Sequence, residues 1–214
     1  MENAGNVLQN YIQKVGWRRI AVMFLGNVLA GMGIGIFKLS GLGNDPFSGM
    51  NMALSADIGM SYPVFQILLN LVFLCMEFAF GKKYIGLGTI VNALLLGYIA
   101  SFFYGIFSSL YVPKGLSFQI MVLVVGMVIC SLGLSMYQTS DAGVAPYDSL
   151  PLILNGKFPR IPFFWCRMLF DGSCALICYL GGGIVGLGTI VTAFGFGPFI
   201  DFFNHKVSRR LAGV

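Results

Sequence analysis

Charged residues are scarce in this chain. Asp, Glu, Lys and Arg make up 10% of its 214 residues, whereas soluble domains carry about 25%. The chain also has a single histidine, His205, so no second histidine is available to complete a metal site. So little charge argues against a soluble protein, and so little histidine argues against the commonest metal and hydrolase sites.

Motifs that mark enzymes are absent as well. The hexapeptide GLGTIV at 86–91 lacks the strand, the longer glycine spacing and the lysine of a phosphate loop. The chain also lacks the matched pair of aspartate motifs that an intramembrane aspartyl protease would need. Five cysteines fall within predicted spans, where free thiols are the default: Cys75, Cys130, Cys166, Cys174 and Cys178. We therefore expect no enzyme activity, no cofactor, no metal site and no nucleic-acid partner.

Hydrophobic residues dominate instead. They make up 57% of the chain, the mean hydropathy is +0.83, and several apolar runs approach the roughly 20 residues that cross a bilayer. The sequence predicts an all-α polytopic membrane protein in contact with the lipid bilayer. Its six predicted spans are 18–40, 61–81, 86–110, 118–140, 161–181 and 185–204, and two segments too short to cross lie at 46–56 and 146–156.

The distribution of basic residues predicts the orientation of these spans. With a cytoplasmic N-terminus, eleven of the thirteen Lys and Arg residues lie at inside ends, and only Lys38 and Lys114 lie outside. The inside residues are Lys14, Arg18, Arg19, Lys82, Lys83, Lys157, Arg160, Arg167, Lys206, Arg209 and Arg210. We expect a multi-pass protein of the bacterial cytoplasmic membrane with both termini in the cytoplasm.

The two ends of the chain are predicted to be cytoplasmic segments. Residues 1–17 are polar for too long to form a cleavable signal peptide. We expect them to form an arm that includes an amphipathic interfacial helix, with an apolar side of Val7, Leu8, Tyr11, Ile12 and Val15. Residues 206–214 form a predicted basic tail.

The chain repeats itself after one hundred residues. The stretch GLGTIV at 86–91 recurs at 186–191, and 20 of the 82 positions from 22 to 103 are identical to the position one hundred residues later. Biased composition would produce about a third of these identities and would not concentrate them on Gly, Pro and one hexapeptide. The sequence therefore predicts two repeats, 18–110 and 118–205, joined by a linker at 111–117.

An odd number of spans in each repeat predicts that the two copies have opposite orientations. Equivalent loops also differ in charge. Lys82 and Lys83 precede the first GLGTIV, whereas glycines precede the second; conversely Lys157 and Arg160 have no basic counterpart in the first repeat. Such differences are expected of loops on opposite sides of the membrane.

The repeated motifs resemble those of a known group of proteins. The paired segments GLGNDPFSG and DAGVAPYDS, each followed two helices later by GLGTIV, and FGPFID in the last helix are similar to the YczE/YyaS/YitT family of bacterial integral membrane proteins. The resemblance covers about residues 18–205. It implies a six-helix inner-membrane protein and transfers no catalytic or binding residue. The two copies differ within the motif, with Asp45 against Ala145 and Ser48 against Asp148.

The two short segments are candidates for a binding site. Pro46 and Pro146 each follow a glycine-rich turn and suit the first position of a short helix. Asp45 is a predicted N-cap, whereas Ala145 leaves backbone N–H groups available to water or an anionic group. Ordinary capped surface turns are the favoured interpretation of both segments. For GLGTIV, close helix packing is favoured over substrate coordination.

Charged side chains deep in a span are costly and commonly functional. Asp171 lies near the middle of its predicted span and Asn70 is its near-equivalent in the first repeat. Arg167 precedes Asp171 by one turn. Two interpretations stay open: an intrahelical pair that neutralises both residues, and a carboxylate in a central cavity that Arg167 tunes. Glu77 is expected to pair with a basic residue near a cytoplasmic helix end.

Together these features predict a transporter-like protein that binds a small polar or amphipathic metabolite between the two repeats. A non-transporting scaffold or regulator of a partner protein is the alternative, and a homo-oligomer is left open. The candidate substrate-binding residues are Asp45, Pro46, Asn70, Asn92, Gln138, Ser140, Asp141, Pro146, Asp148, Arg167, Asp171 and Thr192.

Overall fold

The computed structural model describes residue 13 and residues 15–213, and the secondary structure there consists of helices and turns. Six helices in this part of the chain are long and apolar enough to cross a membrane. They are α2 (Trp17–Ser40), α4 (Tyr62–Phe80), α5 (Leu87–Leu110), α6 (Leu116–Thr139), α8 (Phe163–Leu180) and α9 (Leu187–Phe203), and the last continues to Ala212. Two 12-residue helices, α3 (Pro46–Asp57) and α7 (Pro146–Lys157), are too short to cross.

The predicted spans are confirmed to within two residues at every end except the last. There the helix continues past residue 204 through a π-helical turn, Asn204–Ser208, into α10 (Arg209–Ala212). Arg18 holds this end, because its Nε and Nη2 donate to the backbone oxygens of Leu211 and Arg210, each at 2.7 Å. Most of the predicted basic tail is therefore helical. The predicted amphipathic helix within 1–17 falls largely outside the described residues.

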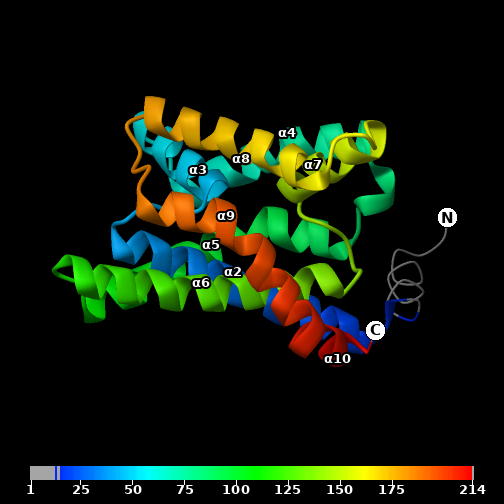
Figure 1. Cartoon of the computed structure of the whole chain (residues 1–214), viewed down its shortest axis with the longest axis horizontal. Coiled ribbons are helices and arrows are strands. Elements are labelled where there is room, and N and C mark those ends of the chain that lie inside the picture. The colour runs from blue at the N-terminus through cyan, green and yellow to red at the C-terminus, as the bar shows by residue number, and fades with distance from the viewer. Residues whose placement is uncertain (1–12, 14, 214) are drawn as a thin grey trace.

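The helices form two layers, as Figure 1 shows. One layer contains α2, α5, α6 and α9, in which α2 packs against α6, α5 against α2, and α9 against α6. The other contains α3, α4, α7 and α8, in which α3 packs against α8 and α7 against α4. Each short helix therefore packs on a long helix from the other half of the sequence.

Glycines bring α2 and α6 into backbone contact. A methyl group at Gly26 would lie 2.5 Å from the backbone nitrogen of Tyr137, and one at Gly33 would overlap Cys130. Further along α2, Phe37 lies against Gly126. The residue numbers rise along α2 as they fall along α6, so the two helices run antiparallel.

Each short helix begins inside the bundle. Asn44 Nδ2 donates to the backbone oxygen of Ile34 at 3.2 Å, six residues before α2 ends, so the chain turns back by about 9 Å before α3 begins. From there α3 runs outward until Asp57 lies beside Gly181, at the end of α8. On the other side, Gly81 packs on Ile153 near the end of α7. The beginnings of α3 and α7 meet, because the rings of Phe47 and Tyr147 stack with centroids 4.2 Å apart.

A short 3₁₀ helix, η1 (Lys82–Tyr84), leads into the first GLGTIV. The two hexapeptides then make reciprocal contacts between the halves. Gly88 N donates to the backbone oxygen of Ala142 at 2.8 Å, and Gly188 N donates to that of Leu42 at 2.8 Å. Each glycine thus meets the loop that precedes the short helix of the other half. The hexapeptides contribute the close packing that the sequence predicts.

Candidate functional site

A small cavity lies between the two layers, where α3 and α7 begin. Its volume is about 50 Å³, enough for one or two water molecules. Polar groups from both halves line it, among them Asp45, Ser48 and Asn92 from the first half and Asp148 and Arg167 from the second. The remaining lining residues are apolar or aromatic: Ile34, Phe47, Leu96, Cys130, Leu134, Ala145, Tyr147 and Phe196.

Arg167, in the first turns of α8, is the centre of a charged network. Its Nε lies 3.0 Å from Asp171 Oδ2, one turn further along the same helix, and its Nη1 lies 2.7 Å from Asp148 Oδ1 in α7. Asp171 is 4% exposed, so the pair with Arg167 keeps a buried carboxylate partnered. The predicted intrahelical pair is present, and it extends to a second carboxylate across a helix interface.

Two tyrosines complete the hydrogen bonding of these carboxylates. Tyr147 OH donates to Asp171 Oδ1 at 2.6 Å, and Tyr137 OH donates to Asp148 Oδ2. The guanidinium of Arg167 also lies over the Tyr147 ring, 5.3 Å from its centroid. Each aspartate therefore binds Arg167 with one oxygen and a tyrosine with the other. The sequence prediction missed both tyrosines.

Asp45 has spare hydrogen-bonding capacity. Its Oδ1 accepts from Ser48 N at 3.0 Å, which confirms the predicted N-cap of α3. Its Oδ2 is buried and has no hydrogen-bond partner among the described residues. Pro46 and Pro146 occupy the first positions of α3 and α7, as predicted, and Ala145 contributes no side-chain cap. Asp45 is thus the carboxylate at this cavity with an oxygen left to bind something else.

The charges around the cavity are unequal. Asp148 and Asp171 contact the guanidinium of Arg167, and Asp45 lines the same cavity, so among the described residues three carboxylates lie near one guanidinium. The N-terminal ends of α3 and α7, each carrying a partial positive charge, offset part of this negative charge. Such a site suits a ligand with polar groups of its own, because buried charges are stable only when partnered.

Three other predicted residues make hydrogen bonds within or between helices. Asn92 lines the cavity, but its Nδ2 donates to Asn27 Oδ1 at 2.9 Å in α2. Asn70 Nδ2 donates to the backbone oxygen of Ala93 at 3.3 Å, and Thr192 Oγ1 donates to its own helix at Gly188 O, 2.9 Å away. Asn70 and Thr192 are buried and do not line the cavity.

The predicted residues that precede α7 lie elsewhere. Gln138 and Asp141 line a separate hollow of about 250 Å³ beside Lys83 and Tyr84. Ser140 is buried, and its hydroxyl donates to the backbone oxygen of Tyr137 at 2.5 Å. The candidate site therefore contains Asp45, Asn92, Asp148, Arg167 and Asp171, with Pro46 and Pro146 beside it, but not these three.

Two buried polar residues of α4 were wrongly predicted or not predicted. Glu77 is 0% exposed and forms no ion pair within the described chain, so the expected pairing with a basic residue is wrong. Gln66 is 1% exposed and packs on α5, where a methyl group at Gly97 would lie 2.5 Å from its Oε1. Neither residue has a symmetric polar counterpart in the sequence that could have signalled its burial.

The chain is similar to a described family and to several proteins of bacteria. Residues 17–205 match the family described as "Family of unknown function (DUF6198)". The chain is 27% identical over 198 residues to an "Uncharacterized protein" of Haemophilus influenzae, which covers 90% of this chain and 86% of that one.

Two proteins of Bacillus subtilis are similar over comparable lengths. The "Uncharacterized membrane protein YczE" is 24% identical over 89% of this chain and 91% of its own. The "Uncharacterized protein YyaS" is 27% identical over 87% of this chain and 92% of its own. These matches confirm the resemblance that the repeated motifs indicated. No solved structure matches the chain.

Proposed function

The chain belongs to the DUF6198 family of unknown function, and from that premise we propose that it is a transporter-like membrane protein. It binds a small polar or amphipathic metabolite in the cavity between its two layers, and this cavity must widen to admit the metabolite, because its volume of about 50 Å³ suits one or two water molecules. The main support for this proposal is that both halves contribute polar groups to this one cavity, at the point where two half-length helices begin. Substrate sites of many transporters lie at such a junction.

The proposal includes an inverted-topology relation between the halves. Its support is that contacts recur between positions one hundred residues apart. The bond from Gly88 to Ala142 has its counterpart from Gly188 to Leu42, and Phe47 stacks on its own equivalent, Tyr147. Contacts of this reciprocal kind are expected around a two-fold axis in the membrane plane. In this arrangement α3 and α7 are re-entrant helices that enter from opposite faces.

We further propose that the protein lies in the bacterial cytoplasmic membrane with both termini inside. The positive-inside bias of its Lys and Arg residues supports this orientation. The contact of Arg18 with Arg210 and Leu211 supports a shared side for the two ends of the described chain. The proposed activity is binding and transport, without catalysis.

A ligand screen on Asp45→Asn tests the proposal. The substitution preserves the N-cap, because Asn caps helices as well as Asp, and removes only the charge facing the cavity. The purified, detergent-solubilised protein is screened by thermal unfolding against a metabolite panel. A ligand at about one hundred times its Kd stabilises the fold by roughly 2.7 kcal/mol. We expect a stabilising compound whose affinity falls at least tenfold in Asp45→Asn.

The matched control is Asp201→Asn, which removes an aspartate of α9 whose side chain is 73% exposed. It should bind the same compound with unchanged affinity. A compound that binds both variants equally would contradict the proposed site. If no compound stabilises the parent protein, the result favours the alternative that the protein is a scaffold or regulator. A protein partner is then the next thing to test for.

A further inference from the structure

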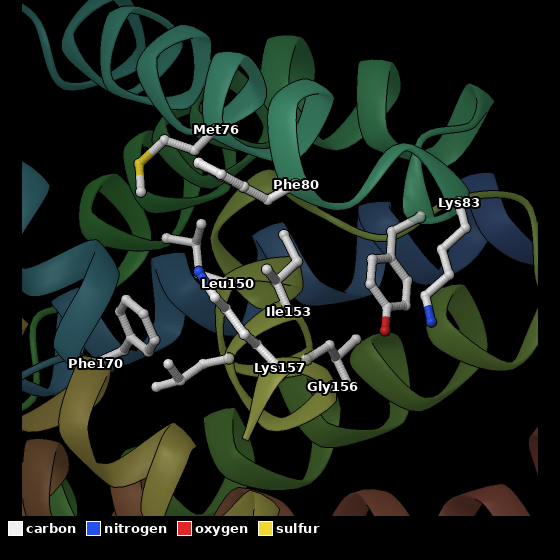
Figure 2. Close-up of a pocket in the computed structure, with 11 residues that line it drawn as sticks. Met76, Phe80, Lys83, Leu150, Ile153, Gly156, Lys157 and Phe170 are labelled. Atoms are coloured by element: carbon white, nitrogen blue, oxygen red, sulfur yellow. The ribbon is translucent and has the colours of Figure 1, made fainter. Parts of the chain in front are cut away.

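A groove of about 500 Å³ lies at the end of α4, away from the central cavity. Figure 2 shows Met76 and Phe80 of α4 on one side and Leu150 and Ile153 of α7 on the other. The remaining lining residues are Lys83, Tyr84, Leu152, Leu154, Gly156, Lys157 and Phe170. The groove therefore has an apolar floor and two lysines.

The place of the groove at the end of α4 indicates how deep in the membrane it lies. Met76 and Phe80 are in the last two turns of a membrane-spanning helix, and their side chains are 42% and 69% exposed. The last turns of a spanning helix lie where hydrocarbon gives way to headgroups. An apolar groove that is open at this level is expected to contain acyl chain, because exposed apolar surface there faces lipid.

The charge of the groove selects among lipids. Lys83 Nζ lies 4.9 Å from the centroid of the Tyr84 ring, and Lys157 Nζ lies 5.9 Å from that of Phe80. Both lysines are exposed, neither has an ion pair among the described residues, and the residues that line the groove include no Asp or Glu. Two unpaired ammonium groups beside an apolar floor complement an anionic headgroup.

A second groove elsewhere in the molecule shows that the fold does not require these lysines. It has a volume of about 340 Å³ and lies at the end of α3. Its lining includes the residues that precede or follow those of the first groove by one hundred: Met52, Ala53, Ala56, Asp57, Gly183 and Ile184. Gly183 and Asp57 stand where the first groove has Lys83 and Lys157, so of these two grooves the first has two lysines, whereas the second has Lys38 together with Asp57.

We propose that the groove between α4 and α7 is a binding site for an anionic phospholipid. One acyl chain lies along Met76, Phe80 and Ile153, and the anionic headgroup lies at the mouth of the groove, within reach of the flexible side chains of Lys83 and Lys157, which point to opposite ends of the groove in Figure 2. This inference is independent of the metabolite site, because no residue lines both the groove and the central cavity.

Native mass spectrometry of the delipidated full-length protein tests the charge selection. Dioleoylphosphatidylglycerol and dioleoylphosphatidylcholine are added separately in detergent. We expect at least fivefold tighter binding of phosphatidylglycerol, and loss of that preference in Lys83→Gln/Lys157→Gln. Lys82→Gln is the matched control, because Lys82 lies over the Phe78 ring and does not line the groove. Equal binding of the two lipids, or a preference that survives the double substitution, overturns the proposal.

A second pair of variants tests the acyl chain. A Cβ at Gly156, which lines the groove, would meet no atom within 4 Å, so Gly156→Trp brings an indole ring to the groove without a clash at the backbone. It should reduce phosphatidylglycerol binding at least fivefold. Gly172→Trp, also in open space but outside the groove, should not. If Gly156→Trp binds normally and inorganic phosphate displaces the lipid, the site takes a soluble phosphate compound and the lipid proposal is wrong.

Photo-crosslinking of the unsubstituted protein provides a test that does not depend on variants. Phosphatidylglycerol with a diazirine in its acyl chain is irradiated in vesicles that contain the protein. Labelled peptides should include Met76–Phe80 or Ile153. Labelling spread evenly over all membrane-facing helices would overturn the proposal.

Discussion

At the scale of single residues, the loss of the Arg167 side chain is expected to be costly for stability. Among the described residues it is the one cation paired with both Asp148 and Asp171. Its removal leaves two carboxylates that have little contact with solvent. We predict that Arg167→Met lowers the free energy of unfolding by about 3 kcal/mol, the usual cost of breaking a buried ion pair from one side. Denaturant or thermal unfolding of the purified protein in detergent measures this loss.

Two comparisons make the Arg167 prediction specific. Arg160→Met removes an exposed arginine near the same end of α8 and should change stability by less than about 0.5 kcal/mol. Adding Asp148→Asn and Asp171→Asn to Arg167→Met removes the unpaired charges and should restore much of the loss. A triple variant less stable than Arg167→Met would show that the carboxylates have another role.

Sequence reasoning identified part of this site because some contacts are local. The pair of Arg167 with Asp171 follows from a four-residue spacing, and the cap at Asp45 follows from its place before a proline. The contacts of Tyr137 and Tyr147 join α6 and α7 to their neighbours and leave no trace in local spacing. A signal existed in the repeat itself, because the positions equivalent to these tyrosines are Phe37 and Phe47. Positions where the second repeat has a polar side chain and the first has an apolar one therefore indicate members of the hydrogen-bond network around Arg167.

At the scale of helices, the reciprocal glycine contacts should be equally important in the two halves. A methyl group at Gly88 would lie 2.8 Å from Gly143 O, and one at Gly188 would lie 2.5 Å from Gly43 O. We predict that Gly88→Ala and Gly188→Ala each destabilise the protein by about 1–3 kcal/mol, the range for overpacking. Thermal unfolding in detergent gives both values.

Gly197→Ala and Gly105→Ala serve as the controls for these contacts. Both glycines lie in helices where an added methyl group meets no atom within 4 Å. Alanine is the better helix former, so these variants should be neutral or slightly more stable. A large loss in only one of Gly88→Ala and Gly188→Ala would mean that the two contacts are not equivalent.

Helix boundaries were predictable because lipid imposes long apolar runs on the sequence. The end of α9 was the exception. The hydrophobic run ends at Lys206, Arg209 and Arg210. The helix nevertheless continues to Ala212, because Arg18 donates hydrogen bonds to its last carbonyl groups. A side chain almost two hundred residues away supplies that cap, and hydropathy does not report such a contact.

At the scale of the whole molecule, the orientation of the two halves can be measured directly. We predict that Ile184→Cys reacts with a membrane-impermeant maleimide on intact cells, whereas Lys83→Cys and Lys206→Cys react only after lysis. Cys75 is replaced by serine in all variants, since it is the exposed native cysteine among the described residues. Equal labelling of residues 83 and 184 in intact cells would contradict the inverted arrangement.

The exchange of loop contacts between the halves has a consequence for biosynthesis. The first turn of α5 contacts the loop at Ala142, which leaves the ribosome some fifty residues later. The first three spans are therefore inserted with that contact unmade, and α5 gains it only after α6 is complete. Nascent chains that stall within α6 should consequently expose the first GLGTIV to quality-control proteases, whereas the matching contact of Gly188 with Leu42 forms only once α9 is made.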